Sequence, residues 1–287
     1  MAKGTKILGC KPSIDQFIVA YMIKTHARVV VVGGGMMGAS LLYHLALEGC
    51  SDTVLVEKSE LTSGSTWHAA GQCPSITGSY NLAKIHAYSN ALYPKLEALT
   101  GQYVSWHPCG GLRLANNEHE LAWLKYVYGF SKSIGFSMDI VGLDEIKRLN
   151  PFLTTDHVIA AAWTRDDGHG DPSGLCNALA KAARDLGATV RRHTRVLDIQ
   201  RRPSGEWEVI TDKGSIVAEM VVNAAGCYAR QVAAMVGADA PITNMQHHYV
   251  VPDDQRQRLG HRVAEFEAQH GVLAERAIQH VEAPLAG

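Results

Sequence analysis

A glycine-rich turn between a buried strand and a helix is the feature that most limits what this chain can fold into. Arg28 to Val32 is a run of β-branched residues, typical of a parallel strand buried on both faces, and Gly33-Gly34-Gly35-Met36-Met37-Gly38 follows it directly. A helical pattern then runs from Ala39 to Leu47, and Thr53 to Glu57 has the pattern of a second strand. This order predicts a βαβ unit.

The glycines of this turn have the G-x-G-x-x-G spacing of dinucleotide-binding proteins. Gly33 permits the tight turn, Gly35 lets a pyrophosphate approach the backbone, and Gly38 lets the helix pack closely on the strand. The helix N-terminus offers N–H groups and a positive dipole end to the phosphates. Glu57 lies 19 residues after Gly38, where its carboxylate can accept hydrogen bonds from both ribose hydroxyls. Together these residues predict a site for an adenine dinucleotide.

The composition fits a globular protein that acts on small molecules. The chain has 287 residues, of which 46% are hydrophobic, and its 27 basic and 28 acidic residues give a net charge of -1. We therefore expect no nucleic-acid partner and, since no apolar run reaches the roughly 20 residues needed to cross a bilayer, no membrane span. The six cysteines have neither disulfide nor metal-ligand spacing, so we expect no metal. They fit a reducing compartment, taken as the cytoplasm, or the mitochondrial matrix in a eukaryote.

The segment after Glu57 favours FAD over NAD as the dinucleotide. Residues 62–71 read Thr-Ser-Gly-Ser-Thr-Trp-His-Ala-Ala-Gly, and such small and hydroxyl side chains suit a loop whose backbone lies against a cofactor. An NAD-binding domain would continue here with further βα repeats. We therefore expect an α/β fold with an FAD-binding, Rossmann-like domain of the glutathione-reductase type and a partial, β-rich substrate domain.

The remaining periodicity predicts an alternation of helices and strands along the chain. Helices are expected at 82–99, 118–133 and 172–186, the last with Asp171 as its N-cap. Strands are expected at 112–115, 158–163, 189–192, 196–200, 207–211 and 220–223.

Several motifs, taken in order, resemble the dimethylglycine dehydrogenase and sarcosine dehydrogenase family, which are FAD-dependent, D-amino-acid-oxidase-like flavoproteins. Gly-Ser-Thr-Trp-His-Ala-Ala-Gly at 64–71 is similar to the flavin-attachment loop of that family. The resemblance covers about residues 27–251. Its other motifs are Leu61-Thr62, Lys84-Ile85-His86, Asp167-Gly168-His169-Gly170-Asp171-Pro172, Val222-Asn223-Ala224-Ala225-Gly226 and Gln246-His247-His248-Tyr249-Val250-Val251.

The resemblance implies which residues serve the cofactor and the substrate. In this family the histidine at the position of His68 is bonded to the 8α carbon of FAD, so a covalent link at His68 is expected. His247 is expected to face the substrate and to accept or orient the proton of its amine. Contacts with FAD are implied for Gly33, Gly35, Met36, Met37, Gly38, Glu57, Lys58, Gly64, Ser65, Thr66, Trp67, Ala69, Ala70, Gly71, Val196, Ala225 and Gly226.

The reaction that the resemblance implies is oxidative demethylation of an N-methylated glycine, such as dimethylglycine or sarcosine, by hydride transfer to flavin N5. A second nucleotide-binding unit is missing, so the electron acceptor would be oxygen or an electron-transfer protein. Two alternatives stay open. The chain could be another enzyme of the same flavin fold, such as a D-amino acid oxidase or a glycerol-3-phosphate dehydrogenase, or a catalytically silent flavin-binding fragment.

The expected domain boundaries follow from where these motifs begin and end. Residues 1–26 would form an N-terminal extension and residues 27–251 the FAD-dependent oxidoreductase domain, with substrate-domain segments around 103–165 and 240–251. Residues 252–287 read as a divergent, charged tail without the final glycine loop of the family. The resemblance therefore implies a chain truncated at its C-terminus.

Overall fold

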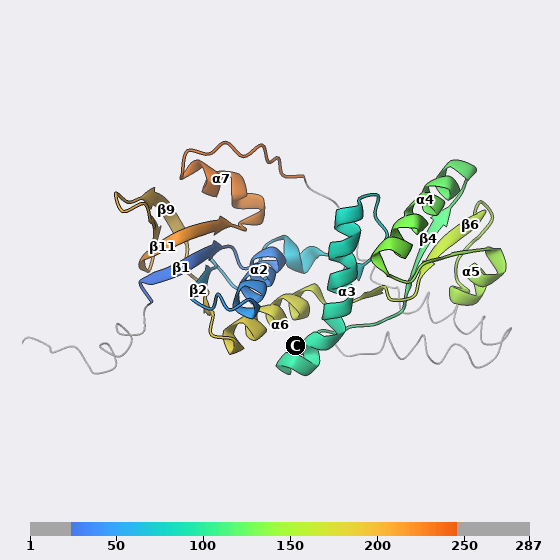
Figure 1. The fold of residues 1–287 in the computed structure, drawn as a ribbon, viewed down its shortest axis with the longest axis horizontal. Helices are drawn as coiled ribbons and strands as arrows, with labels where there is room; N and C mark the ends of the chain where they lie inside the picture. The colour runs from blue at the N-terminus through green and yellow to red at the C-terminus, as the bar shows by residue number, and fades with distance from the viewer. Residues whose placement is uncertain (1–23, 246–287) are drawn as a thin grey trace, which may run out of the picture.

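The computed structural model describes residues 24–245, and its main element is a six-stranded sheet in the order β8-β2-β1-β11-β10-β9 (Figure 1). Its parallel part consists of β8 (Thr189–Arg191), β2 (Thr53–Val56), β1 (His26–Val32) and the second part of β11 (Gly214–Asn223). Two antiparallel strands, β10 (Trp207–Thr211) and β9 (Val196–Arg201), extend this sheet. The predicted α/β class with a mostly parallel sheet is confirmed.

Strand β1 is buried on both faces, as its run of valines predicts. Val29 and Val31 pack on one face with α2 (Met36–Leu47) and α6 (Pro172–Asp185). Val30 and Val32 pack on the other face with residues of β9 to β11 and of α7 (Ala229–Ala234). Full burial of a valine stabilises a fold by about 1.5–3 kcal/mol. The packing of β1 therefore fixes the position of the glycine turn that follows it.

Helix α6 begins at the residue that the sequence predicts. The carboxylate of Asp171 accepts hydrogen bonds from the N–H groups of Ser173 (3.1 Å) and Gly174 (2.8 Å), and Pro172 occupies the first turn. The helix buries Leu175 and Leu179 together with α2 against the sheet. The cap thus fixes the residue at which α6 begins, and with it the position of the segment that precedes the helix.

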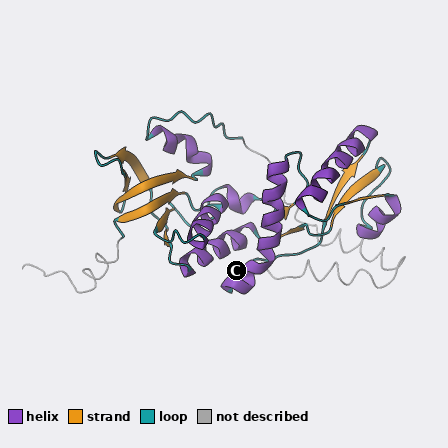
Figure 2. Cartoon of the chain, in the orientation of Figure 1, coloured by secondary structure: helices purple, strands orange, loops and turns teal. Residues whose placement is uncertain are grey.

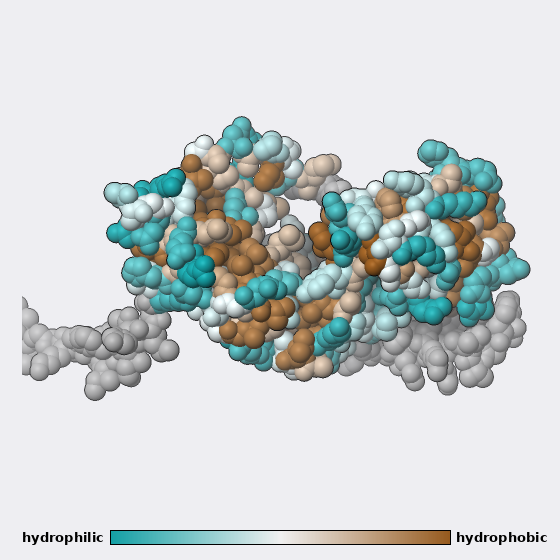
Figure 3. All heavy atoms as spheres, in the orientation of Figure 1, coloured by the Kyte–Doolittle hydropathy of each residue, from teal (hydrophilic) through white to brown (hydrophobic). Residues whose placement is uncertain are grey.

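A second, smaller sheet forms the other end of the molecule (Figure 2). Its antiparallel order is β4 (Gly111–Ala115), β6 (Ala160–Thr164) and β5 (Asp139–Val141). Its two faces are covered by α4 (Glu118–Ile134) and α5 (Leu143–Leu149), while the long helix α3 (Tyr80–Thr100) lies between the two sheets (Figure 1). The space-filling view shows a hollow between the two ends, bordered by hydrophobic residues on the side of the larger sheet (Figure 3).

The structure differs from the sequence prediction in the length of one strand, in the segment after Glu57 and in several short elements. Strand β11 starts at Gly214 rather than at 220, because residues 214–218 first form a hairpin with β10 before the strand continues beside β1. The stretch 62–71, expected to be a loop, contains a 3-10 turn η1 (Ser65–His68), and a short strand β3 (Gln72–Cys73) follows it. Strand β3 pairs with β7 (Gly168–His169). Three short elements, β5, α5 and α7, were not predicted.

Two further sequence expectations concern the membrane and the cysteines. No helix among the described residues is both long and apolar enough to cross a membrane. The described cysteines are all free thiols, in agreement with their scattered spacing: Cys50, Cys73, Cys109, Cys176 and Cys227.

Candidate functional site

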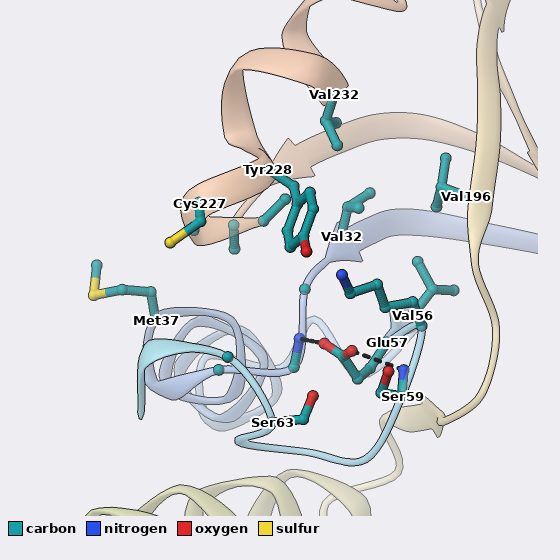
Figure 4. Close-up of a pocket in the computed structure, with 18 of the residues that line it drawn as sticks. Val32, Met37, Val56, Glu57, Ser59, Ser63, Val196, Cys227, Tyr228 and Val232 are labelled. Carbon is teal, nitrogen blue, oxygen red and sulfur yellow. Dashed lines mark hydrogen bonds between the residues drawn. The ribbon is translucent and has the colours of Figure 1, made fainter. Parts of the chain in front are cut away.

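A cavity of about 860 Å³ opens where β1 and β2 end, and the glycine turn forms one of its walls (Figure 4). Ligands of open α/β sheets bind at this place, outside the carboxyl ends of the strands, and cofactor pockets have about this size. The cavity gathers predicted residues from four distant parts of the chain. They are Gly33, Gly35, Met36, Met37, Glu57, Lys58, Gly64, Ser65, Thr66, His68, Val196, Ala225 and Gly226.

Five residues predicted to contact the cofactor do not line this cavity. Gly38 is buried inside the first turn of α2, where a Cβ atom would stand 1.9 Å from the carbonyl oxygen of Gly33. Its role is therefore close packing of the helix on the turn, as its place in the motif indicates. Trp67 has its side chain 54% exposed beside His68, and Ala69, Ala70 and Gly71 lead away from the cavity toward β3.

The N-terminus of α2 faces the cavity without a side-chain cap of its own. Its N-cap residue is Gly35, which has no side chain to accept from the first N–H groups, and the nearest substitute is the hydroxyl of Thr66. That oxygen accepts a hydrogen bond from the N–H of Met36 at 3.0 Å. The first N–H groups of a helix have no partner within the helix and carry its positive dipole end, so this end of α2 suits an anionic group such as a phosphate.

Glu57 is the acidic residue of the site and lies at the end of β2, with only 9% of its surface exposed. One carboxylate oxygen accepts a hydrogen bond from the N–H of Gly34 (2.7 Å), and the other accepts from the N–H of Ser59 (2.9 Å), as Figure 4 shows. A carboxylate offers about four acceptor positions, so two remain for hydroxyl donors in the cavity. Glu57 thus holds the glycine turn in place, and its predicted bonds to a ribose are compatible with the two it already makes.

Sequence reasoning missed the wall opposite Glu57, which comes from the segment after Gly226. Tyr228 faces the cavity there (Figure 4). The ammonium of Lys58 lies 3.4 Å from the centre of its ring. The Ser65 hydroxyl and the Cys227 thiol make a hydrogen bond of 3.4 Å across the same region. The Ala-Ala-Gly motif at 224–226 points to this neighbourhood. Of the other missed residues, Gly34, Ser63 and Ala224 lie inside motifs but were not assigned to the site, and no motif marks the rest. The full set of these other residues is Val32, Gly34, Val56, Ser59, Ser63, Thr194, Arg195, Ala224, Gln231, Val232 and Met235.

The structure describes one of the two histidines to which the resemblance gives a role, His68, but not the other. His68 ends the η1 turn and lines the cavity, and its ring lies against that of Trp67 with a centroid distance of 3.9 Å and a tilt of 37°. His247 lies outside the described residues. The structure therefore places His68 at the cavity, whereas the role of His247 stays a prediction from the sequence.

The fold and the site define an α/β dinucleotide-binding domain. The chain belongs to the FAD dependent oxidoreductase family (DAO), which it matches over residues 28–275. The glycine turn, the acceptors of Glu57 and the N-terminus of α2, whose own N-cap residue is a glycine, fit the ribose and phosphates of FAD. The match includes part of the range expected to be a divergent tail, so the domain boundaries 1–26, 27–251 and 252–287 stay proposals.

Individual relatives narrow the kind of oxidoreductase. The chain is 43% identical over 228 residues to the mitochondrial dimethylglycine dehydrogenase of Rattus norvegicus, and this covers 79% of the chain and 27% of that protein. It is 36% identical to the mitochondrial sarcosine dehydrogenase of Homo sapiens, over 88% of the chain and 27% of that protein. The chain thus spans about a quarter of the length of these relatives. The solved structure of L-proline dehydrogenase from P. horikoshii is similar with a TM-score of 0.69 and 28% identity, covering 75% of this chain and 57% of that one.

Proposed function

We propose that this chain binds FAD in the cavity and is the flavin-binding part of an enzyme that oxidises a small amine at a carbon next to nitrogen. The observation that carries the proposal is the convergence of the glycine turn, Glu57 and His68 on one cavity. The relatives support the kind of substrate, since dimethylglycine, sarcosine and L-proline all have a secondary or tertiary amine. Both curated relatives are mitochondrial, which supports a matrix location if the chain is eukaryotic.

The proposed substrate is an N-methylated glycine, either dimethylglycine or sarcosine. Bound FAD supplies the oxidising chemistry by accepting a hydride from the N-methyl carbon. The protein must present the amine in its neutral form, because a protonated nitrogen has no lone pair to stabilise the carbon that loses hydride. We assign that proton to His247, because histidine is the side chain that most often transfers a proton in catalysis. Water then converts the substrate iminium to formaldehyde and the demethylated amine, and oxygen or an electron-transfer protein takes up the two electrons.

The second part of the proposal is a covalent bond between His68 and the flavin. An imidazole nitrogen of His68 would bond to the 8α methyl carbon, and that methyl group would release one proton to solvent. The imidazolium so formed would release its N–H proton, and the electron pair left by the methyl proton would reduce the flavin. Oxygen would reoxidise the flavin and leave as hydrogen peroxide. The position of His68 on the cavity wall supports this, and so does the match of residues 64–71 to the attachment loop of the resembling family.

Anaerobic reduction of the flavin tests the proposed reaction directly. The purified, FAD-loaded chain is mixed with dimethylglycine, sarcosine, D-alanine or glycerol 3-phosphate, and the loss of the oxidised flavin absorbance is followed. Reduction by an N-methylated glycine alone supports the proposal. Reduction by D-alanine or glycerol 3-phosphate would assign the chain to another enzyme of the flavin fold, and reduction by none of the four would contradict the enzymatic part of the proposal.

Acid precipitation tests the covalent bond. We expect the yellow colour to stay with the precipitated wild-type chain and to pass into the supernatant for His68→Ala. The matched control is His119→Ala, which removes an exposed histidine on α4, away from the cavity. That variant should keep its flavin. A wild-type chain that saturates with FAD and releases all of it on precipitation would rule out the bond.

A further inference from the structure

One sequence motif has no role in the proposed reaction, namely Asp167-Gly168-His169-Gly170-Asp171-Pro172, which joins β6 to α6. We call residues 167–173 the anchor segment and residues 62–75 the His68 loop. The anchor segment runs along the His68 loop from one end to the other. At the start of the loop, the hydroxyl of Ser173 donates a hydrogen bond to that of Thr62 at 3.3 Å. The two segments are distant in sequence, so these contacts are tertiary.

The middle of the contact is made backbone to backbone. The N–H of Gly170 donates to the carbonyl oxygen of Gly71 at 3.1 Å, and β3 pairs with β7 immediately afterwards. A Cβ atom at Gly71 would stand 2.1 Å from the carbonyl oxygen of Gly170, and the φ of Gly71 is +76°. A side chain at this position would therefore push the two segments apart. This close approach follows His68 by only three residues.

The far end of the loop is held by the carboxylate of Asp167, which is only 3% exposed. One of its oxygens accepts hydrogen bonds from the backbone N–H of Ser75 (2.9 Å), the hydroxyl of Ser75 (2.6 Å) and the side-chain amide of Asn90 (3.1 Å). The other oxygen accepts from the hydroxyl of Thr164. Ser75 belongs to the His68 loop, Asn90 to α3 and Thr164 to β6. A single buried side chain therefore joins three elements, including one strand of the smaller sheet.

We infer that Asp167 is the positioning residue for the His68 loop, and that it sets where His68 stands at the cavity wall. This inference rests on the proposed role of His68 toward FAD. Asp167 does not itself line the cavity, so it acts through the loop rather than through contact with the cofactor. The carboxylate is suited to this because it is an acceptor only, and all four groups around it donate.

The substitution Asp167→Asn tests the inference with little change in volume. It replaces one acceptor oxygen by an amide that donates. On the side of Ser75 and Asn90 this amide would meet donors, whereas on the other side the Thr164 hydroxyl can turn toward the Gly111 carbonyl and accept. The control Asp171→Asn lies on the same anchor segment, but asparagine caps a helix as well as aspartate does. Ser75→Ala is the second test variant, since it removes only the 2.6 Å hydroxyl bond and decides the question if Asp167→Asn does not fold.

Two measurements separate loop positioning from a general loss of structure. The first is amide hydrogen exchange of the cofactor-free chain, where loss of a hydrogen bond to a charged group should speed exchange over residues 64–73 by about 10-fold or more. Exchange over β1 and the glycine turn should stay as in the wild type. The second is the rate at which added FAD becomes bonded to the chain, measured as flavin that stays with the acid-precipitated protein. This rate should fall about 10-fold or more. The FAD dissociation constant, measured in a His68→Ala background, should change by less than about 3-fold.

The outcomes distinguish this inference from the proposed function. Faster exchange confined to residues 64–73 in Asp167→Asn and Ser75→Ala, with Asp171→Asn unchanged, supports the inference. Faster exchange over these residues in Ser75→Ala alone also supports it, because the amide of Asp167→Asn can face Thr164 and leave the bonds to the loop intact. Unchanged exchange in a folded Ser75→Ala chain, or equal acceleration throughout the domain, overturns it. If the wild-type chain never forms a bond with FAD, the proposed role of His68 fails, and hydrogen exchange in the cofactor-free protein still decides whether Asp167 holds the loop.

Discussion

The substitution Glu57→Gln should weaken both the fold and FAD binding, because the carboxylate serves both. In the structure it accepts one backbone hydrogen bond at each oxygen, from Gly34 at 2.7 Å and from Ser59 at 2.9 Å. Glutamine keeps one acceptor oxygen, so one of the two N–H groups loses its partner. A hydrogen bond to a charged group contributes about 1.5–3 kcal/mol, and we expect the free energy of unfolding to fall by about that amount.

Glu57→Gln should also weaken the binding of FAD. We propose that the two remaining acceptor positions bind the ribose hydroxyls, and the amide nitrogen of glutamine cannot accept. Loss of one such bond should raise the FAD dissociation constant about 10- to 100-fold, since about 1.4 kcal/mol corresponds to a factor of ten. Binding is measured by quenching of flavin fluorescence in a His68→Ala background, so that a covalent bond does not mask the equilibrium. Stability is measured by urea unfolding.

Glu60→Gln is the matched control for this experiment. Glu60 lies three residues further on, with its side chain 55% exposed, and pairs with Arg192 and His193 at the surface. Surface ion pairs contribute little to stability, and Glu60 does not line the cavity, so both quantities should stay close to wild type. If Glu57→Gln retains wild-type stability and FAD affinity, the account of Glu57 is refuted. A loss of stability without any loss of affinity would leave only its structural part.

Three further predictions follow from the packing, the thiols and the sequence motif. Gly38→Ala should destabilise the fold by about 1–3 kcal/mol in urea unfolding, because its Cβ would stand 1.9 Å from the Gly33 oxygen, whereas Gly129→Ala, with open space in α4, should not. Burial, and to a lesser degree the charge of Asp167, raises the pKa of Cys73 from 9.0 to about 11, and burial with the charge of Glu57 raises the pKa of Cys176 to about 12. As the pH rises above 9.0, these thiols ionise in the unfolded chain before they do in the folded one. The free energy of unfolding, which is at its full value below pH 9.0, should therefore fall as the pH rises toward these values. A smaller fall in Cys73→Ala and Cys176→Ala would show that these two thiols cause it. His247→Ala should slow flavin reduction by the amine about 10²- to 10⁴-fold without changing the flavin spectrum, and an unaltered rate would remove His247 from the reaction.

The parts of the fold that the sequence predicted are those with strong local signals. The valine run of β1, the glycine turn and the Asp171-Pro172 start of α6 each depend on neighbours in sequence, and all three are found where expected. Helices α5 and α7 have 7 and 6 residues, too few for a clear period, and were missed. They are stabilised by tertiary packing, α5 through Ile146 against the smaller sheet and α7 through Val232 against the larger.

In the site too, residues with a local sequence signal were predicted, and residues placed by tertiary packing were not. The motifs indicated the glycine turn, Glu57 and the loop around His68, because their residue types carry the chemistry. They gave no sign of Tyr228 opposite Lys58, or of the bonds from Ser75 and Asn90 to Asp167, because those partners are far apart in sequence and of common types. Contacts of this kind depend on how the elements pack, which no local pattern records.

The central claim is that the cavity beside the glycine turn binds FAD, and native mass spectrometry of the chain with added FAD tests it most directly. Wild type and Gly142→Val, a change into open space in the smaller sheet region, should each carry one FAD per chain. Gly35→Val should carry none while remaining folded, because it adds bulk where the pyrophosphate is expected to lie and where a Cβ already meets the Thr66 hydroxyl at 3.0 Å. A wild-type chain without FAD, or a Gly35→Val chain that holds a full equivalent, would contradict the claim.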